Sequence, residues 1–205
     1  MYRLQSMPEG GKRFFSYRLA NSGQGDSMAR KDSAERWQEK GNKLLDKEQF
    51  KEAIDAYHKA IKMDPEISEL WNCLGVALES IGSYEESIAA HDQAIKIDPM
   101  AKEAWNNKAN ALDSLGRYEE ALEAFDRAIE IDPQVDWAWS NKSVVLAGLS
   151  RFEEALQCCQ KALEIDPNNV GAWHNKALVL QELHRDSEAE EALARARKLD
   201  EGSIN

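Results

Sequence analysis

The chain has 205 residues, of which 42% are hydrophobic and 31% are charged, a composition typical of one or two globular domains and not of a disordered chain. Its 26 lysines and arginines against 37 aspartates and glutamates give a formal net charge of −11, which argues against nucleic acid as a partner because that binding depends on cationic side chains. No apolar run approaches the roughly 20 residues of a membrane span and no signal peptide is recognisable, so we expect a cytoplasmic protein without a membrane span.

The first 33 residues form an arm whose charge is opposite to that of the rest of the chain. Residues 1–31 hold six basic residues and two acidic ones, a net charge of +4, so the remainder carries −15. The arm also holds Phe14, Phe15 and Tyr17, and several glycines interrupt it. Two interpretations stay open: a leader without a binding role, or a segment that docks on the acidic remainder, within one chain or between two, through charge and aromatic contacts.

From residue 34 onward the chain repeats itself every 34 residues. Five of the six tryptophans and four of the five prolines recur at this interval, at Trp37, Trp71, Trp105, Trp139, Trp173, Pro65, Pro99, Pro133 and Pro167. A fixed period of this length predicts stacked helix-turn-helix repeats, each of which buries its apolar face against its neighbours. With tryptophan at place 4, the five repeats span residues 34–67, 68–101, 102–135, 136–169 and 170–201, and residues 202–205 form a tail.

Two places within each repeat predict how its two helices pack. Place 8 carries a small residue and place 24 carries, in most repeats, a bulky one: the pairs are Gly41 and Tyr57, Gly75 and His91, Ala109 and Phe125, Ser143 and Cys159, and Ala177 and Leu193. We expect the small residue to let the two backbones approach and the bulky residue to fill the remaining space. Places 4, 8 and 11 together form the expected buried stripe of the first helix.

Turn residues mark where the helices end. Gly82 and Gly116 at place 15 are expected to end first helices with positive φ angles. Ser83 and Glu86 are spaced as a capping box that opens the second helix of repeat 2. An Asp-Pro pair closes each of the first four repeats, because proline disfavours helix at the preceding residue and cannot continue the backbone hydrogen bonds. Ten helices are therefore expected in the five repeats.

Repeat 3 carries the fullest version of a known pattern, in Trp105, Ala109, Tyr118, Ala121, Phe125, Ala128 and Pro133. In these residues and their spacing the chain strongly resembles the tetratricopeptide repeat (TPR) family, over residues 34 to about 201. The resemblance implies an all-α fold, a right-handed superhelical solenoid of five TPR repeats similar to the regular arrays of archaeal and bacterial proteins. The fold by itself names no partner.

The resemblance also implies where a ligand binds. In TPR proteins the groove is the concave face, built mainly by places 2, 5, 6, 9, 12 and 13 of the first helices. Among these places we select as peptide-binding residues Asn42, Asn72, Glu103, Asn106, Asn107, Asn110, Trp137, Asn141, Val144, His174, Asn175 and Leu178. The groove places of repeats 1 to 3 include carboxylates but no lysine or arginine, whereas those of repeats 4 and 5 are nearly neutral and more apolar. We therefore expect a protein or peptide ligand that is basic or neutral rather than acidic.

Two features of this groove admit a structural as well as a binding interpretation. Trp137, the only tryptophan outside the repeat register, is either an aromatic anchor for a ligand or a filler between helices. Asn107, Asn141 and Asn175 recur at place 6, where such ladders hold extended peptides in the glycosyltransferase and kinesin light-chain members of the family. Asparagine is also common at this place in TPR sequences without a known ligand.

Several other functions find no support in the sequence. The clamp with which some TPR domains hold the carboxylate tails of heat-shock chaperones needs lysine and arginine, and here only Asn42 matches it. No catalytic constellation, phosphate loop or metal-ligand spacing occurs, so we expect no metal site and no cofactor. The three cysteines suit a reducing compartment, and Cys159, at place 24, is expected in the core.

The sequence thus favours a non-enzymatic scaffold that binds a peptide segment of a partner protein. Repeat 5 departs from the pattern, with Asp186 in place of an aromatic residue and Glu201 in place of proline, and no capping helix follows it. An alternative is therefore a self-assembly module that forms homo-oligomers through the arm or through this uncapped repeat. A third alternative is an enzyme of unknown type.

Overall fold

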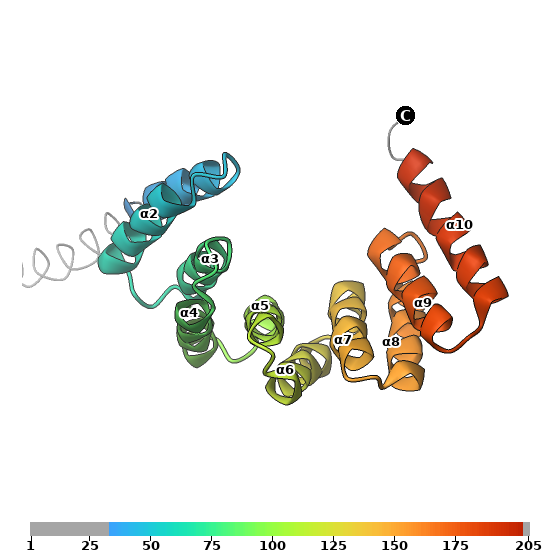
Figure 1. The fold of residues 1–205 in the computed structure, drawn as a ribbon. Coiled ribbons are helices and arrows are strands. Elements are labelled where there is room, and N and C mark those ends of the chain that lie inside the picture. The colour runs from blue at the N-terminus through green and yellow to red at the C-terminus, as the bar shows by residue number, and fades with distance from the viewer. Residues whose placement is uncertain (1–32, 203–205) are drawn as a thin grey trace, which may run out of the picture. The chain divides into compact units, whose positions relative to one another are not determined.

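The computed structural model describes residues 33–202, which form helices joined by short turns (Figure 1). The chain divides into two bodies, one up to Glu66 and one from Ile67 onward. We describe each body by itself. The arm up to residue 32 and the tail after Gly202 lie outside the described residues, and so does the predicted docking of the arm on the rest of the chain.

The first body contains repeat 1 as a helical hairpin. Residues 33–45 are helical, and α2 (Phe50–Met63) follows after a short turn. The Tyr57 side chain is fully buried, and its hydroxyl donates a hydrogen bond of 2.8 Å to Asn42 Oδ1. A Cβ atom on Gly41 would lie only 2.5 Å from the Tyr57 ring, so glycine is what lets this ring lie against the first helix.

The second body contains repeats 2 to 5. Its helices are α3 (Ser68–Glu79), α4 (Tyr84–Ile97), α5 (Lys102–Ser114), α6 (Tyr118–Ile131), α7 (Asp136–Gly148), α8 (Phe152–Ile165), α9 (Val170–Glu182) and α10 (Asp186–Gly202). Every first helix begins at place 1 of its repeat and every second helix at place 17, as the period of 34 residues predicts. None of the helices within residues 33–202 is long and apolar enough to cross a membrane.

The contacts between helices show how repeats 2 to 5 stack. Each first helix packs against its own second helix, and α5, α7 and α9 also pack against the second helix of the preceding repeat. The backbones of α3, α5, α7 and α9 approach one another in sequence, whereas those of α4, α6, α8 and α10 lie farther apart. Since the first helices lie closer together than the second helices, the first helices line the concave side of this stack.

The core confirms the predicted pairing of places 8 and 24. Phe125 and Cys159 are buried in the second body. His91 is also fully buried, and a Cβ atom added to Gly75 would lie only 2.4 Å from its ring. The prediction that the place 4 tryptophans are buried is wrong, because these residues are only half-buried. The indole N–H groups need a hydrogen-bond acceptor, and in Trp105 that acceptor is the Pro99 carbonyl oxygen at 3.1 Å, with equivalent bonds in repeats 4 and 5.

The ends of the helices confirm two of the three predicted turn features. Gly82 and Gly116 have φ angles of +78° and +72°. Asp98, which precedes a proline, is extended, and its carboxylate accepts the Met100 backbone N–H at 2.9 Å. The capping box at Ser83 is wrong, since its side chain makes no cap hydrogen bond.

Repeats 3 to 5 have arginine at the place that Ser83 occupies in repeat 2. Each arginine pairs with a glutamate three residues later, so the start of the second helix is held by an ion pair. The pairs are Arg117–Glu120, Arg151–Glu154 and Arg185–Glu188. In all three pairs the hydrogen bond to arginine lowers the pKa of the glutamate. Because the pairs are exposed, each contributes little to stability.

The residue at place 15 has a left-handed backbone conformation in the repeats without glycine as well. Glu48, Ser150 and His184 have φ angles of +58°, +58° and +56°, a conformation that costs an L-residue roughly 1 kcal/mol relative to glycine. We expect Ser150→Gly and His184→Gly each to raise the free energy of unfolding by about 1 kcal/mol, measured by urea denaturation. The matched control is Gly116→Ala, which should lower it by a similar amount; equal stability of all three variants would contradict this explanation.

Candidate functional site

The candidate site is the inner face of the second body, defined as places 2, 5, 6, 9, 12 and 13 of α3, α5, α7 and α9. Most of the predicted ligand residues lie on it with partly or fully exposed side chains: Asn72, Glu103, Asn107, Asn110, Trp137, Asn141, Val144, His174, Asn175 and Leu178. Asn106 differs, because only 7% of its surface is exposed. Asn42 lies in the first body, where its side-chain oxygen accepts the Tyr57 hydroxyl.

The place 6 asparagines connect neighbouring repeats. Each donates a hydrogen bond through Nδ2 to the place 5 residue of the preceding repeat. The bonds join Asn107 to Asn72 Oδ1 at 3.1 Å, Asn141 to Asn106 Oδ1 at 3.2 Å, and Asn175 to the Ser140 hydroxyl at 3.1 Å. Because place 5 lies in the seam between adjacent first helices, Asn106 and Ser140 are buried there. The ladder therefore fixes the spacing of the helices that form the inner face.

This arrangement predicts different effects for two asparagines on the inner face. Asn141→Ala removes the donor to Asn106 and leaves a buried acceptor unpaired, which should cost about 1 to 2 kcal/mol of unfolding free energy. Asn110→Ala, at place 9, breaks none of the ladder bonds and should change stability by less than about 0.5 kcal/mol. Urea denaturation of both variants tests the contrast, which equal losses would refute.

The half of the inner face formed by α3 and α5 is acidic. Its groove places hold Glu69, Glu79, Glu103 and Asp113 and no basic residue. Partial burial raises the pKa of Glu79 and that of Asp113, because burial disfavours the charged form of a carboxyl group. A cation placed against these carboxylates would restore the interactions that they lose on leaving water.

An acidic hollow of about 590 Å³ lies at the α3–α5 side of this face. Its lining residues are Ser68, Glu69, Asn72, Cys73, Asp98, Met100, Ala101, Glu103 and Ala104. Asp98 and Met100 were missed by the sequence analysis because they belong to the turn between repeats, outside the six groove places. Met100 is 64% exposed, and this exposure of a large apolar residue beside three carboxylates is the feature that marks the hollow.

The half formed by α7 and α9 is mostly uncharged and has exposed apolar side chains. Val144 and Leu178, both at place 9, are 46% and 60% exposed. A Cβ atom added at Gly148, place 13 of α7, would have no neighbour within 4 Å, so the surface beside Val144 is open. Glu182 is the one carboxylate on the groove places of these two helices.

Trp137 packs between helices and keeps part of its surface on the inner face. Its side chain packs against a buried cluster of Ala128, Ile129, Val135 and Ala138, between α6 and α7. It is nevertheless only partly buried, and place 2 puts it on the inner face. Loss of its side chain would therefore affect the packing of this cluster in addition to any ligand contact.

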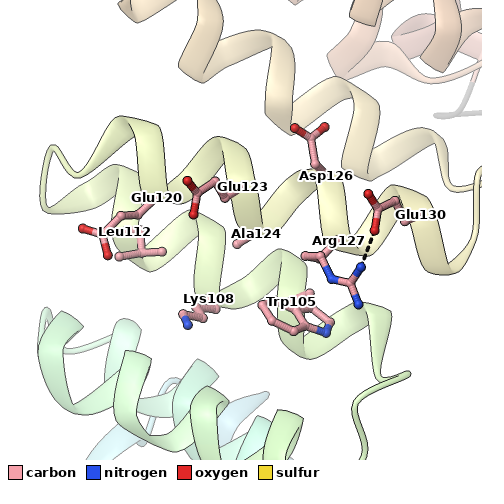
Figure 2. A pocket seen from close by; sticks show the side chains of 9 residues that line it. All are labelled: Trp105, Lys108, Leu112, Glu120, Glu123, Ala124, Asp126, Arg127 and Glu130. Carbon is pink, nitrogen blue, oxygen red and sulfur yellow. Dashed lines mark hydrogen bonds and ion pairs between the residues drawn. The ribbon is translucent and has the colours of Figure 1, made fainter.

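A second type of hollow lies between the two helices of a repeat. In repeat 3 it has a volume of about 430 Å³, and Figure 2 shows its lining, with Trp105 and Lys108 opposite the side chains of α6. The Lys108 ammonium and the Arg127 guanidinium lie 5.6 Å and 5.8 Å from the Trp105 ring, and Arg127 pairs with Glu130. Related hollows lie beside Trp139 and Trp173. Because they recur with the repeat, we attribute them to the packing of each hairpin.

In the described part of the chain, the remaining chemically active side chains do not gather into a site. Burial raises the pKa of the Cys158 thiol to about 11, which keeps it protonated and unreactive, and Cys159 is fully buried as place 24 predicts. His174 lies on the inner face, 3.9 Å from Asp200 of α10. Within residues 33–202 no group of three or more histidine, cysteine, aspartate or glutamate side chains is arranged to hold a metal ion.

Comparison with protein families identifies the repeats. Three family models, each described as a tetratricopeptide repeat, match residues 39–99, residues 103–135 with 137–169, and residues 158–192. No curated protein sequence matches the chain.

Solved structures of low sequence identity share the fold. A MamA structure from Desulfovibrio magneticus RS-1 matches with a TM-score of 0.72 and 18% identity, over 85% of this chain and 98% of that chain. PilF of Pseudomonas aeruginosa matches with a TM-score of 0.74 and 18% identity, over 82% and 78%. YrrB, a TPR protein with an unusual peptide-binding site, matches with a TM-score of 0.61 and 20% identity, over 80% and 84%.

Proposed function

We propose that this chain, which belongs to the tetratricopeptide repeat family, is a non-enzymatic adaptor that binds a basic or neutral segment of a partner protein on its inner face. The family and the similarity to MamA and YrrB support a protein-interaction scaffold. The observation that carries the choice of ligand is the acidic half of the inner face, where four carboxylates face no basic groove residue. Attraction between these carboxylates and a basic segment increases both affinity and the rate of association.

Self-assembly through the last repeat is less well supported than peptide binding. In repeats 2 to 4, place 21 holds Ile88, Leu122 and Leu156, which are buried in the core. In repeat 5 the same place holds Glu190, and place 28 holds Arg197 where earlier repeats have isoleucine or leucine; both charged residues are exposed. Charged residues at these places give α10 the polar outer surface of a terminal cap. Self-assembly through the arm concerns residues outside the described part of the chain.

The proposal is tested by measuring how the charge of a peptide affects its binding to the full chain. We expect fluorescence anisotropy to detect binding of a lysine-rich peptide and much weaker binding of a glutamate-rich peptide of equal length. Glu103→Lys should reverse this order, and added salt should weaken the binding of the basic peptide. A matched control is Glu123→Lys, an equal charge change on α6 outside the inner face. Tighter binding of the acidic peptide, or equal effects of both variants, would contradict the proposal.

A further inference from the structure

The chemistry of the inner face changes between α5 and α7. Along place 2 the residues are Glu69, Glu103, Trp137 and Gly171, and along place 12 they are Glu79, Asp113, Ala147 and Gln181. Both rows therefore change from carboxylates to uncharged residues at the same junction. Because the asparagine ladder connects α3 to α5, α5 to α7 and α7 to α9, the two halves hold a fixed position relative to each other.

The acidic hollow fits a lysine or arginine side chain. Glu69, Asp98 and Glu103 line one hollow of about 590 Å³, and no basic residue is among its lining residues. Met100, exposed beside them, offers an apolar surface for the methylene groups that carry the charge of lysine or arginine. An anionic side chain would meet repulsion from all three carboxylates.

The exposed apolar pair on α7 and α9, Val144 and Leu178, fits a large aliphatic or aromatic side chain. Val144 and Leu178 occupy the same place on α7 and α9, which contact each other, so the two side chains are neighbours on the inner face. Both are exposed, and the surface at Gly148 is open. An apolar ligand side chain that covers Val144 and Leu178 would remove this exposed apolar area from water.

The distance between the two ends sets the length of the ligand. The acidic hollow lies between α3 and α5, and the apolar pair lies on α7 and α9, two helices further along the stack. Packed helices are about 8 to 10 Å apart, so the acidic hollow and the apolar pair are about 16 to 20 Å apart. An extended peptide advances about 3.3 Å per residue and spans this distance in about six residues.

We propose that the occupant of the inner face is an extended peptide segment in which a lysine or arginine and a large apolar residue are about six residues apart. The proposal rests on the proposed function and adds a second anchor and a spacing to it. The first anchor is bound by the acidic hollow and the second by Val144 and Leu178. Charge alone would select any basic segment, whereas the pair of anchors selects one class of them.

The test uses the full chain and a series of Gly/Ser-based peptides whose only charged side chains are two arginines and whose only large apolar side chain is one leucine. The arginines and the leucine are separated by two, six or ten residues, and affinities are measured by fluorescence anisotropy. We expect the spacing of six to bind at least about fivefold more tightly than the other two. Leu178→Ser should lower the affinity for the peptide with the spacing of six about tenfold. The same variant should not change the affinity for a peptide in which alanine replaces the leucine.

Two variants outside the inner face serve as controls, and the outcomes separate the two proposals. Ile81→Ser changes an exposed apolar residue in the turn between α3 and α4, and Glu123→Gln changes a carboxylate of α6; neither should alter binding. Equal affinity at all three spacings, or no effect of Leu178→Ser, would overturn the two-anchor proposal. If the binding then still depends on peptide charge and on Glu103, the proposed function stands. If no arginine peptide binds, both proposals fall.

Discussion

His91→Phe is expected to raise the free energy of unfolding and to make it less dependent on pH. The His91 ring is fully buried in the second body, and neither ring nitrogen has a hydrogen-bond partner. Burial lowers its pKa from 6.5 to about 4; the nearby charge of Asp92 raises the pKa by a smaller amount and that of Lys108 lowers it. A buried polar group without a hydrogen-bond partner lowers the free energy of unfolding by about 1 to 3 kcal/mol. Phenylalanine has no polar atom in its side chain, so this cost is removed. Phenylalanine fits at this place, since Phe125 occupies it opposite the larger Ala109 in repeat 3.

The sign of the pH effect follows from the lowered pKa. Between pH 6.5 and about 4 the unfolded chain binds a proton at His91 that the folded chain does not, so unfolding is favoured as the pH falls. The titration of His91 therefore leaves the free energy of unfolding unchanged above pH 6.5 and lowers it by about 3 kcal/mol as the pH falls to 4. Urea denaturation at several pH values should show this loss in the wild type and not in His91→Phe. An exposed histidine, His58, provides the control in His58→Phe. Equal pH dependence of wild type and His91→Phe would refute the assignment.

Gly41→Ala is expected to destabilise the first body by about 1 to 3 kcal/mol. The added Cβ atom would lie 2.5 Å from Tyr57 Cε1, and the buried ring has no free space into which it can move without cost. Gly148→Ala, where the Cβ atom has no neighbour within 4 Å, is the matched control and should not destabilise the protein. Thermal and urea denaturation measure both effects.

A double-mutant cycle identifies the cause of the loss at Gly41. Repeat 5 carries alanine and leucine at the two equivalent places, Ala177 and Leu193, so this smaller pair packs in the same fold. Adding Tyr57→Leu to Gly41→Ala should therefore cost less than the sum of the two single variants. Strict additivity would mean that the contact between Gly41 and Tyr57 is not responsible.

The period of the sequence predicted the helices well because the same two boundaries recur in every repeat. Place 1 and place 17 start helices throughout the second body, and the pairing of Gly75 with His91 could be inferred from residue size alone. The N-terminal cap could not, because Ser83 has the right side chain for a capping box but does not form one. A local spacing of residues shows which hydrogen bond is available and not which one is made.

The candidate site was predicted in outline and not in its details. Asn106 and Asn107 are adjacent polar residues, and only the packing of α5 against α3 and α7 decides their roles. Asn106 is buried and accepts a hydrogen bond from α7, while Asn107 donates one to α3. Asp98 and Met100 belong to a turn whose position depends on the stacking of two repeats. Helical periodicity describes one helix at a time, so it cannot show what neighbouring helices and turns place together.

The way in which neighbouring repeats are joined determines how the second body responds to force. Tension along the stack is carried from one repeat to the next by the packing of each first helix against the preceding second helix, and by the first helices with their asparagine bonds. Small extensions should increase the spacing between the second helices on the convex side of the stack. At larger force the repeats should unravel one at a time, each releasing about 120 Å of chain for its 34 residues in an optical-trap recording.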